Sequence, residues 1–164
     1  MGKETSIVEK LELAVPGFHG YKKKELLRED DRLVRGKVAD ILARARREME
    51  RAIQRCAMVS CAQLMSLDTM RKKLMMLESR VRHAEAGYRG YFDRVKFREE
   101  EIKRLIEYDA KMIELAEEIL DNVKAINGGI ANPQALGMAV LELDDKLNSF
   151  EEVLSRRMSF AVGE

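Results

Sequence analysis

Apolar residues recur along most of this chain at steps of three and four residues, the spacing that places side chains on one face of an α-helix. Four long stretches and one short N-terminal stretch show this pattern. We therefore predict helices over residues 6–15, 22–57, 63–86, 93–127 and 133–160. The long helices would bury their apolar faces against one another. The predicted fold is all-α: an antiparallel bundle of four long helices plus a short N-terminal helix, in a single domain of residues 1–164.

Residues at the ends of these stretches support the predicted boundaries. Ser6 and Glu9 have the spacing of a capping box for the first helix, and Pro16 follows where that helix should end. Asn132 and Pro133 suit the N-cap and the first position of the last helix. The apolar residues of the last helix keep a strict heptad spacing and should lie in the core: Leu136, Val140, Leu143, Leu147, Phe150 and Leu154.

The boundary between the second and third stretches contains neither glycine nor proline. An unbroken helix across it would be about 95 Å long at about 1.5 Å per residue, which is too long for one domain of this size to cover. We therefore predict that the chain turns near Met58–Gln63.

The composition agrees with a helical protein outside the membrane. Charged residues make up 36% of the chain, aromatic residues 5%, and there is no Trp, which is typical of long amphipathic helices. No apolar run reaches the roughly 18 to 20 residues that a membrane span requires, and the N-terminus lacks the layout of a signal peptide. We expect a cytoplasmic protein without a membrane span.

The charges are distributed unevenly, although the formal net charge is only +1. Residues 22–98 hold 21 Lys and Arg against 11 Asp and Glu, whereas residues 99–164 hold 7 against 15. A basic half can mark a nucleic-acid surface, but two halves of one bundle can also neutralise each other across helix interfaces. Acidic residues are interleaved in the basic half, so we favour the second interpretation.

The residues needed for catalysis or metal binding are scarce. A carboxylate di-metal bundle requires Glu-x-x-His pairs, but His19 and His83 are preceded at that spacing by Pro16 and Arg80. No Cys–His cluster suits zinc, and Gly128-Gly129 lacks the Lys-Ser/Thr of a phosphate-binding loop. We therefore expect no enzyme activity, no cofactor and no metal site.

Cys56 and Cys61 are the only cysteines. On one continuous helix, residues five apart point about 140° away from each other and could not form a bridge. We expect two buried free thiols.

One stripe of arginines lies on a single face of the second predicted helix: Arg44, Arg47, Arg51 and Arg55. Such a stripe can contact phosphates. However, Glu48 and Glu50 lie among the arginines, and no aromatic residue is available for base stacking. A solvated or bundle-facing stripe is the favoured interpretation, and polyanion (nucleic-acid) binding is the alternative.

Methionines also cluster in the basic half, at Met49, Met58, Met65, Met70, Met75 and Met76. Core filling is the favoured interpretation, because Met adapts to irregular gaps; an exposed Met stripe would instead offer an adaptable surface to a partner.

Two glycine-aromatic junctions carry a resemblance to a known family. The first reads Val15-Pro16-Gly17-Phe18-His19-Gly20-Tyr21-Lys22 and precedes Arg28-Glu29-Asp30-Asp31-Arg32. The second reads Gly87-Tyr88-Arg89-Gly90-Tyr91-Phe92-Asp93-Arg94-Val95-Lys96 and leads into Glu107-Tyr108-Asp109. With these motifs, most of the chain resembles an uncharacterised family of small helical proteins of bacteria and archaea. Some members are encoded near band-7 (stomatin-like) membrane-scaffold proteins, so the resemblance implies a partner of that class and no catalytic residue.

Six of the nine aromatic residues fall in or just after these junctions: Phe18, Tyr21, Tyr88, Tyr91, Phe92 and Phe97. If the second and third helices form an antiparallel hairpin, both junctions lie at the same end of the bundle, and Tyr21 should lie within about 10 Å of Tyr91. The rings would form a hydrophobic plug, which is the favoured interpretation. Alternatively, they would line a pocket at whose mouth His19 and Arg89 bind a partner segment or a small anion.

These observations together predict a non-catalytic helical interaction or scaffold protein. The helices carry more apolar surface than four helices need to cover one another. We therefore expect the chain to bind a second copy of itself, as a homo-oligomer, or another protein.

Overall fold

The computed structural model describes residues 2–23, 26–84 and 99–161. These ranges contain helices and no strand, which confirms the predicted all-α class. The helices are α1 (Gly2–Ala14), α2 (Leu27–Met58), α3 (Leu64–His83), α5 (Glu99–Gly128) and α6 (Pro133–Ala161).

Most predicted helix boundaries agree with the structure, and two do not. Helix α1 begins at Gly2, so Ser6 and Glu9 lie within the helix and do not cap its start. Helix α2 begins at Leu27 and not near residue 22, and residues 21–23 are not helical. The predicted N-cap of α6 is confirmed, since the Asn132 side-chain oxygen accepts the backbone N–H of Ala135 at 3.2 Å. The predicted segments 85–86 and 93–98 lie outside the described residues.

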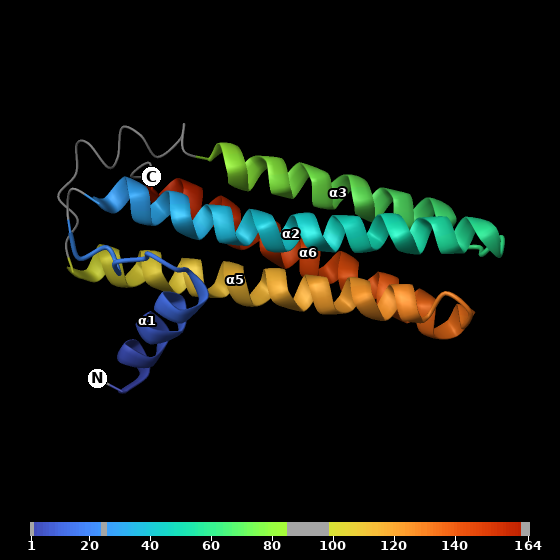
Figure 1. The fold of residues 1–164 in the computed structure, drawn as a ribbon, viewed down its shortest axis with the longest axis horizontal. Helices are drawn as coiled ribbons and strands as arrows, with labels where there is room; N and C mark the ends of the chain where they lie inside the picture. The colour runs from blue at the N-terminus through green and yellow to red at the C-terminus, as the bar shows by residue number, and fades with distance from the viewer. Residues whose placement is uncertain (1, 24–25, 85–98, 162–164) are drawn as a thin grey trace.

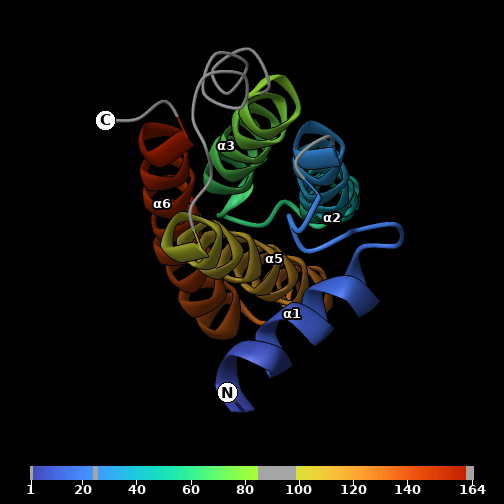
Figure 2. The ribbon, with the colours of Figure 1, turned by 90° about the vertical axis from the view of Figure 1, so that its left-hand side faces the viewer.

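The four long helices lie side by side as two hairpins. Helices α2 and α3 form one antiparallel hairpin, and α5 and α6 form the other (Figure 1). Viewed end-on, α2, α3, α6 and α5 follow one another around the core, and α1 packs against α5 (Figure 2). The predicted antiparallel pairing is therefore present within each hairpin. Between the hairpins, α2 runs parallel to α5 and α3 runs parallel to α6 (Figure 1). We call the end with the start of α2 the proximal end, and the end with both hairpin turns the distal end.

The core is formed by the apolar faces that the sequence pattern predicts. All six heptad residues of α6 are buried, including Leu143 and Leu147. Helix α1 adds Leu11 to the same core cluster, and Val15 follows it there just after the helix ends. The large-to-small substitutions Leu143→Ala and Leu147→Ala would each cost about 2 to 5 kcal/mol.

The α2–α3 turn lies at the predicted place and is built as a Schellman motif. Ser60 adopts the left-handed conformation, with φ +53°, and its N–H donates to the Ala57 carbonyl at 3.3 Å. The Cys61 N–H donates to the Cys56 carbonyl at 2.9 Å. In this motif the residue after the left-handed position lies over the last full turn of the helix, where the two side chains touch.

Cys56 and Cys61 occupy these two touching positions and form a disulfide, with their Cα atoms 5.0 Å apart. The expectation of free thiols was therefore wrong. The angle of about 140° applies only to a continuous helix, whereas the chain leaves the helix after Met58 and folds back through Ser60.

Ion pairs join the basic and acidic halves of the chain across the α3–α6 interface. Lys73 pairs with Asp144 at 2.5 Å, and Arg80 pairs with Glu151 at 3.2 Å. Both pairs support the interpretation that the two halves neutralise each other within one bundle.

Candidate functional site

The loop before α2 is held against the bundle by one buried carboxylate. Asp30 accepts the backbone N–H of His19 at 2.8 Å and that of Tyr21 at 2.9 Å. Gly17 and Gly20 have positive φ angles, as does Tyr21 at +58°. A left-handed conformation costs a non-glycine residue about 1 to 2 kcal/mol, and the bonds to Asp30 offset that cost. This conformation directs the Tyr21 side chain into the core.

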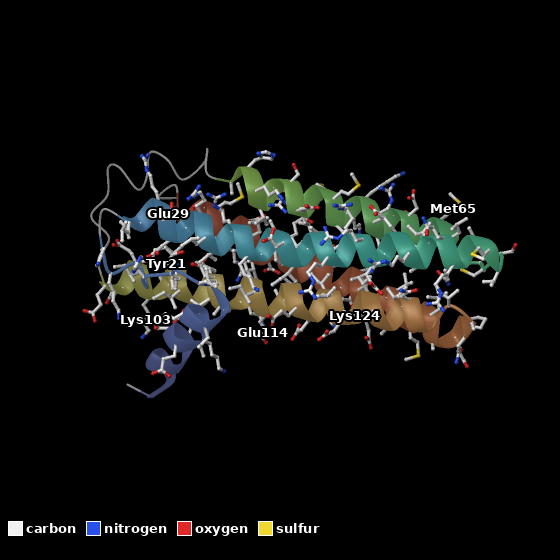
Figure 3. All side chains as sticks on the ribbon, viewed as in Figure 1. Tyr21, Glu29, Met65, Lys103, Glu114 and Lys124 are labelled. Atoms are coloured by element: carbon white, nitrogen blue, oxygen red, sulfur yellow. A yellow bond between two sulfur atoms is a disulfide. The ribbon has the colours of Figure 1, made fainter. Side chains whose placement is uncertain are left out.

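Tyr21 connects this loop to α5. Its ring is 1% exposed and packs edge-to-face on Phe18, with ring centroids 5.1 Å apart. Its hydroxyl donates a hydrogen bond to the Asp109 carboxylate. Figure 3 labels Tyr21 at the proximal end of the bundle, opposite to Met65.

Arg157, on α6, lies at the centre of this end and is fully buried. Its Nε donates to Asp109 Oδ1 at 2.5 Å, and its Nη2 donates to Asp31 Oδ1 at 2.7 Å. Nη2 also lies 3.4 Å from the Tyr21 hydroxyl. One guanidinium thus joins α6 to α5, to α2 and to the loop.

Arg35 continues the same set of contacts to α3. Its Nε donates to Asp31 Oδ2 at 2.8 Å, and its Nη1 donates to the carbonyls of Val81 and Arg82 at 3.2 and 3.1 Å. These carbonyls belong to the last turn of α3, where backbone acceptors have no partner within the helix. The cation also lies favourably at a helix C-terminus.

We call Tyr21, Asp31, Arg35, Asp109 and Arg157 the polar network. It contacts the loop and all four long helices, and its two carboxylates match its two guanidiniums in charge. Buried ion pairs add little net stability, because desolvation offsets their attraction, but removing one partner leaves a buried charge. The network therefore favours this arrangement of helices over others that would separate its members.

Burial shifts the pKa of two members of this network, Tyr21 and Asp109. Desolvation raises the pKa of Tyr21 well above its usual value, and the neighbouring Asp109 carboxylate raises it further. Desolvation also raises the pKa of Asp109, although Arg157 opposes that change. Each of the five side chains is at most 3% exposed. They are covered by the rest of the bundle in this structure.

Asp31, Asp109 and Arg157 were not predicted from the sequence as site residues, although a signal for them was present. Each stands at an apolar position of its helix pattern. Arg157, for example, follows Leu154 by three residues on the heptad of α6. A charged residue at a core position predicts a buried partner, because an unpaired charge there is too costly.

The predicted junction residues are only partly covered by the described chain. Phe18 and Tyr21 are buried, whereas the His19 side chain is exposed. Tyr88, Arg89, Tyr91 and Phe92 lie outside the described residues, so the expected approach of Tyr21 and Tyr91 stays a prediction.

The predicted basic stripe lies on the outer face of α2, and all four of its arginines are exposed. Arg51 pairs with Glu48 at 2.7 Å. Arg55 donates to the Asn127 carbonyl at 3.0 Å and to its side-chain oxygen at 2.8 Å. The stripe is therefore solvated, as the favoured interpretation predicts.

The methionines do not fill the core as predicted. Met49 and Met70 are buried, but the other four are exposed: Met58, Met65, Met75 and Met76. The prediction failed because Met tolerates both environments, so its presence says little about which face of a helix is covered.

Exposed apolar side chains gather over the α3–α6 interface. The pairs Lys73–Asp144 and Arg80–Glu151 place each residue of α3 level with the residue 71 positions later in α6. Four exposed residues then lie within about three helical turns of one another, on the outer sides of the two helices. We call them the α3–α6 patch: Met65, Met76, Met138 and Leu141.

A groove of about 560 Å³ opens at the distal end, between the α2–α3 turn and the α5–α6 turn. Its lining includes Arg55, Val59, Cys61, Ile130 and Leu136. A second groove, of about 500 Å³, separates α1 from α5.

No protein-family model matches the sequence, and no curated protein or solved structure matches it significantly. The resemblance to the uncharacterised helical family therefore stays a prediction. None of the described helices combines the length and apolar character needed to cross a membrane. Within the described ranges, no three His, Cys, Asp or Glu side chains gather as metal ligands would.

Proposed function

We propose that this chain is a helical scaffold or interaction protein that associates with a second copy of itself through the α3–α6 patch. The observation that carries the proposal is the exposure of this patch: Met65 is 85% exposed, Leu141 69% and Met138 65%. Large contiguous apolar patches are uncommon on the surfaces of monomers and mark association surfaces.

The charges around the patch favour a second copy of this chain as the occupant. Lys72 is exposed on the α3 side, level with residue 143 of α6, and Glu142 and Asp145 are exposed on the α6 side. A two-fold axis over the α3–α6 interface, parallel to the helices, would place α3 of each copy on α6 of the other. Basic residues would then face acidic residues twice, and the apolar side chains would be covered at the centre.

Sedimentation velocity at micromolar concentrations tests the proposal. The unmodified chain should sediment as a dimer, and Leu141→Glu should convert it to a monomer, because a carboxylate would be buried in the contact. Leu13→Glu is the matched control, since Leu13 is 85% exposed on α1, away from the patch. A monomeric parent chain, or equal effects of the two substitutions, would contradict the proposal.

The resemblance supports a further partner, a band-7 membrane-scaffold protein. If the patch serves that partner, Leu141→Glu should abolish its capture in a pull-down, whereas Leu13→Glu should not. If both variants still capture the partner, binding uses another surface.

Polyanion binding is a second candidate function, favoured by Arg44 and Arg47. Both are exposed, and no ion pair of theirs is found in the described part of the chain. The double substitution Arg44→Gln and Arg47→Gln should weaken binding to duplex DNA at low salt, where phosphate contacts are strongest. Absence of DNA binding by the parent chain at low salt would exclude this function.

A further inference from the structure

The Cys56–Cys61 disulfide has one shielded and one accessible half. Cys56 belongs to the last turns of α2, is 0% exposed and forms part of the core cluster. Cys61 lies after the turn, is partly exposed and lines the distal groove. A molecule in the groove therefore lies against Cys61, whereas Cys56 is covered by the core.

The groove has the size and lining of a small-molecule site. Its volume of about 560 Å³ lies in the range of pockets that hold such ligands. Val59, Ile130 and Leu136 provide apolar walls, and the exposed Arg55 provides a positive charge at the edge. This lining suits a small organic molecule that carries a negative charge.

We propose that this disulfide is an exchange site for small anionic thiols, which enter the distal groove and bond to Cys61. The proposal is independent of self-association through the α3–α6 patch. It makes the α2–α3 turn a covalent modification site as well as a connection between two helices.

The thiolate of the small thiol attacks the Cys61 sulfur, a new S–S bond forms, and the Cys56–Cys61 bond breaks. Cys56 leaves as a thiolate and takes up a proton from solvent. A second small thiol can then attack the mixed disulfide, which releases the oxidised small disulfide and leaves two protein thiols. The small thiol is the reductant, and its disulfide is the oxidant for the reverse direction.

The backbone geometry suits a reversible bond. The hydrogen bonds that hold Ser60 and Cys61 over the end of α2 involve only backbone atoms, so they can persist after the disulfide opens. The two sulfur atoms then remain close, and the bond can form again within the chain. The disulfide also closes a very short loop, so its opening frees little chain entropy. The fold should therefore tolerate both redox states.

Single-cysteine variants provide the test. Each variant is incubated under native conditions with oxidised glutathione, and the intact mass is followed over time. Cys56→Ser retains the accessible Cys61 and should form the mixed disulfide. Cys61→Ser retains only the shielded Cys56 and should react at least tenfold more slowly until denaturant is added. Equal rates for the two native variants would overturn the proposal.

Two further measurements complete the test. In the parent chain, limited reduction followed by peptide mapping should locate the first glutathione adduct on Cys61, even if a serine variant folds poorly. A disulfide that opens only together with global unfolding would be a structural crosslink and would overturn the proposal. Arg55→Gln should slow the reaction of the Cys56→Ser variant with oxidised glutathione several-fold, but not its reaction with the cationic disulfide cystamine. Equal effects on both reagents would overturn the preference for anions.

Discussion

Arg157 on α6 and Asp109 on α5 form an ion pair with Nε and Oδ1 2.5 Å apart, and neither side chain exposes any surface. The same guanidinium reaches Asp31 on α2, so one residue connects three helices at the proximal end. Tyr21 adds the loop before α2 through its bond to Asp109. The packing of the helices and the loop at this end of the bundle therefore depends on a set of polar contacts within an otherwise apolar core.

Removing the buried guanidinium should be far more costly than removing its neighbour on the helix. Arg157→Met leaves two buried carboxylates without their shared partner and should lower the free energy of unfolding by about 3 to 5 kcal/mol. Arg156 is exposed and pairs with Glu152, so Arg156→Met should cost less than about 1 kcal/mol. Urea denaturation of the two variants measures the difference. Similar losses would show that the network contributes no more than a surface pair.

Tyr21→Phe removes the hydroxyl that donates to Asp109 and keeps the ring packed on Phe18. At neutral pH the loss of a hydrogen bond to a buried carboxylate should cost about 1.5 to 3 kcal/mol. Chemical denaturation at neutral pH measures this cost. Because the phenol is a buried donor, a loss near zero would mean that the bond to Asp109 is replaced by another contact.

The same variant should also change how stability depends on pH. The folded-state pKa of Tyr21 is raised well above the unfolded value, so its contribution is complete below about pH 10 and declines as the pH rises further. The parent chain should therefore lose stability above about pH 10, and the difference between it and Tyr21→Phe should shrink there. Denaturation curves at about pH 8 and about pH 11 test this. A constant difference would contradict the raised pKa.

Gly36 offers a stabilising substitution. It lies within α2, and a Cβ atom added there would meet nothing within 4 Å. Gly36→Ala should therefore raise the free energy of unfolding by about 1 kcal/mol through helix propensity. Gly17→Ala is the opposite case, because Gly17 has φ +87°, and it should destabilise the chain. Thermal melting of both variants measures the two signs, and a destabilising Gly36→Ala would indicate that this part of α2 contacts another surface.

The sequence by itself determined the features that depend on neighbouring residues along the chain. The three- and four-residue spacing identified the long helices, and the heptad of α6 identified its buried residues, because both follow from the geometry of a single helix. The turn near Met58–Gln63 followed from length alone, since an unbroken helix could not have been covered. Asn132 was recognisable as an N-cap for the same local reason.

Only the tertiary structure decided which helices are neighbours and which charges meet. The pattern within each helix defines an apolar face but not the helix that covers it, so the parallel contact of α3 with α6 could not be predicted. Asp31, Asp109 and Arg157 are stable at core positions only because three helices bring them together. The disulfide likewise depends on the left-handed backbone of Ser60, which ends the helix between Cys56 and Cys61 and brings their side chains together. The angle between two positions of a continuous helix gives no sign of such a turn. The exposure of Met65 was decided the same way, because hydrophobicity favours burial but only a neighbouring helix can provide it.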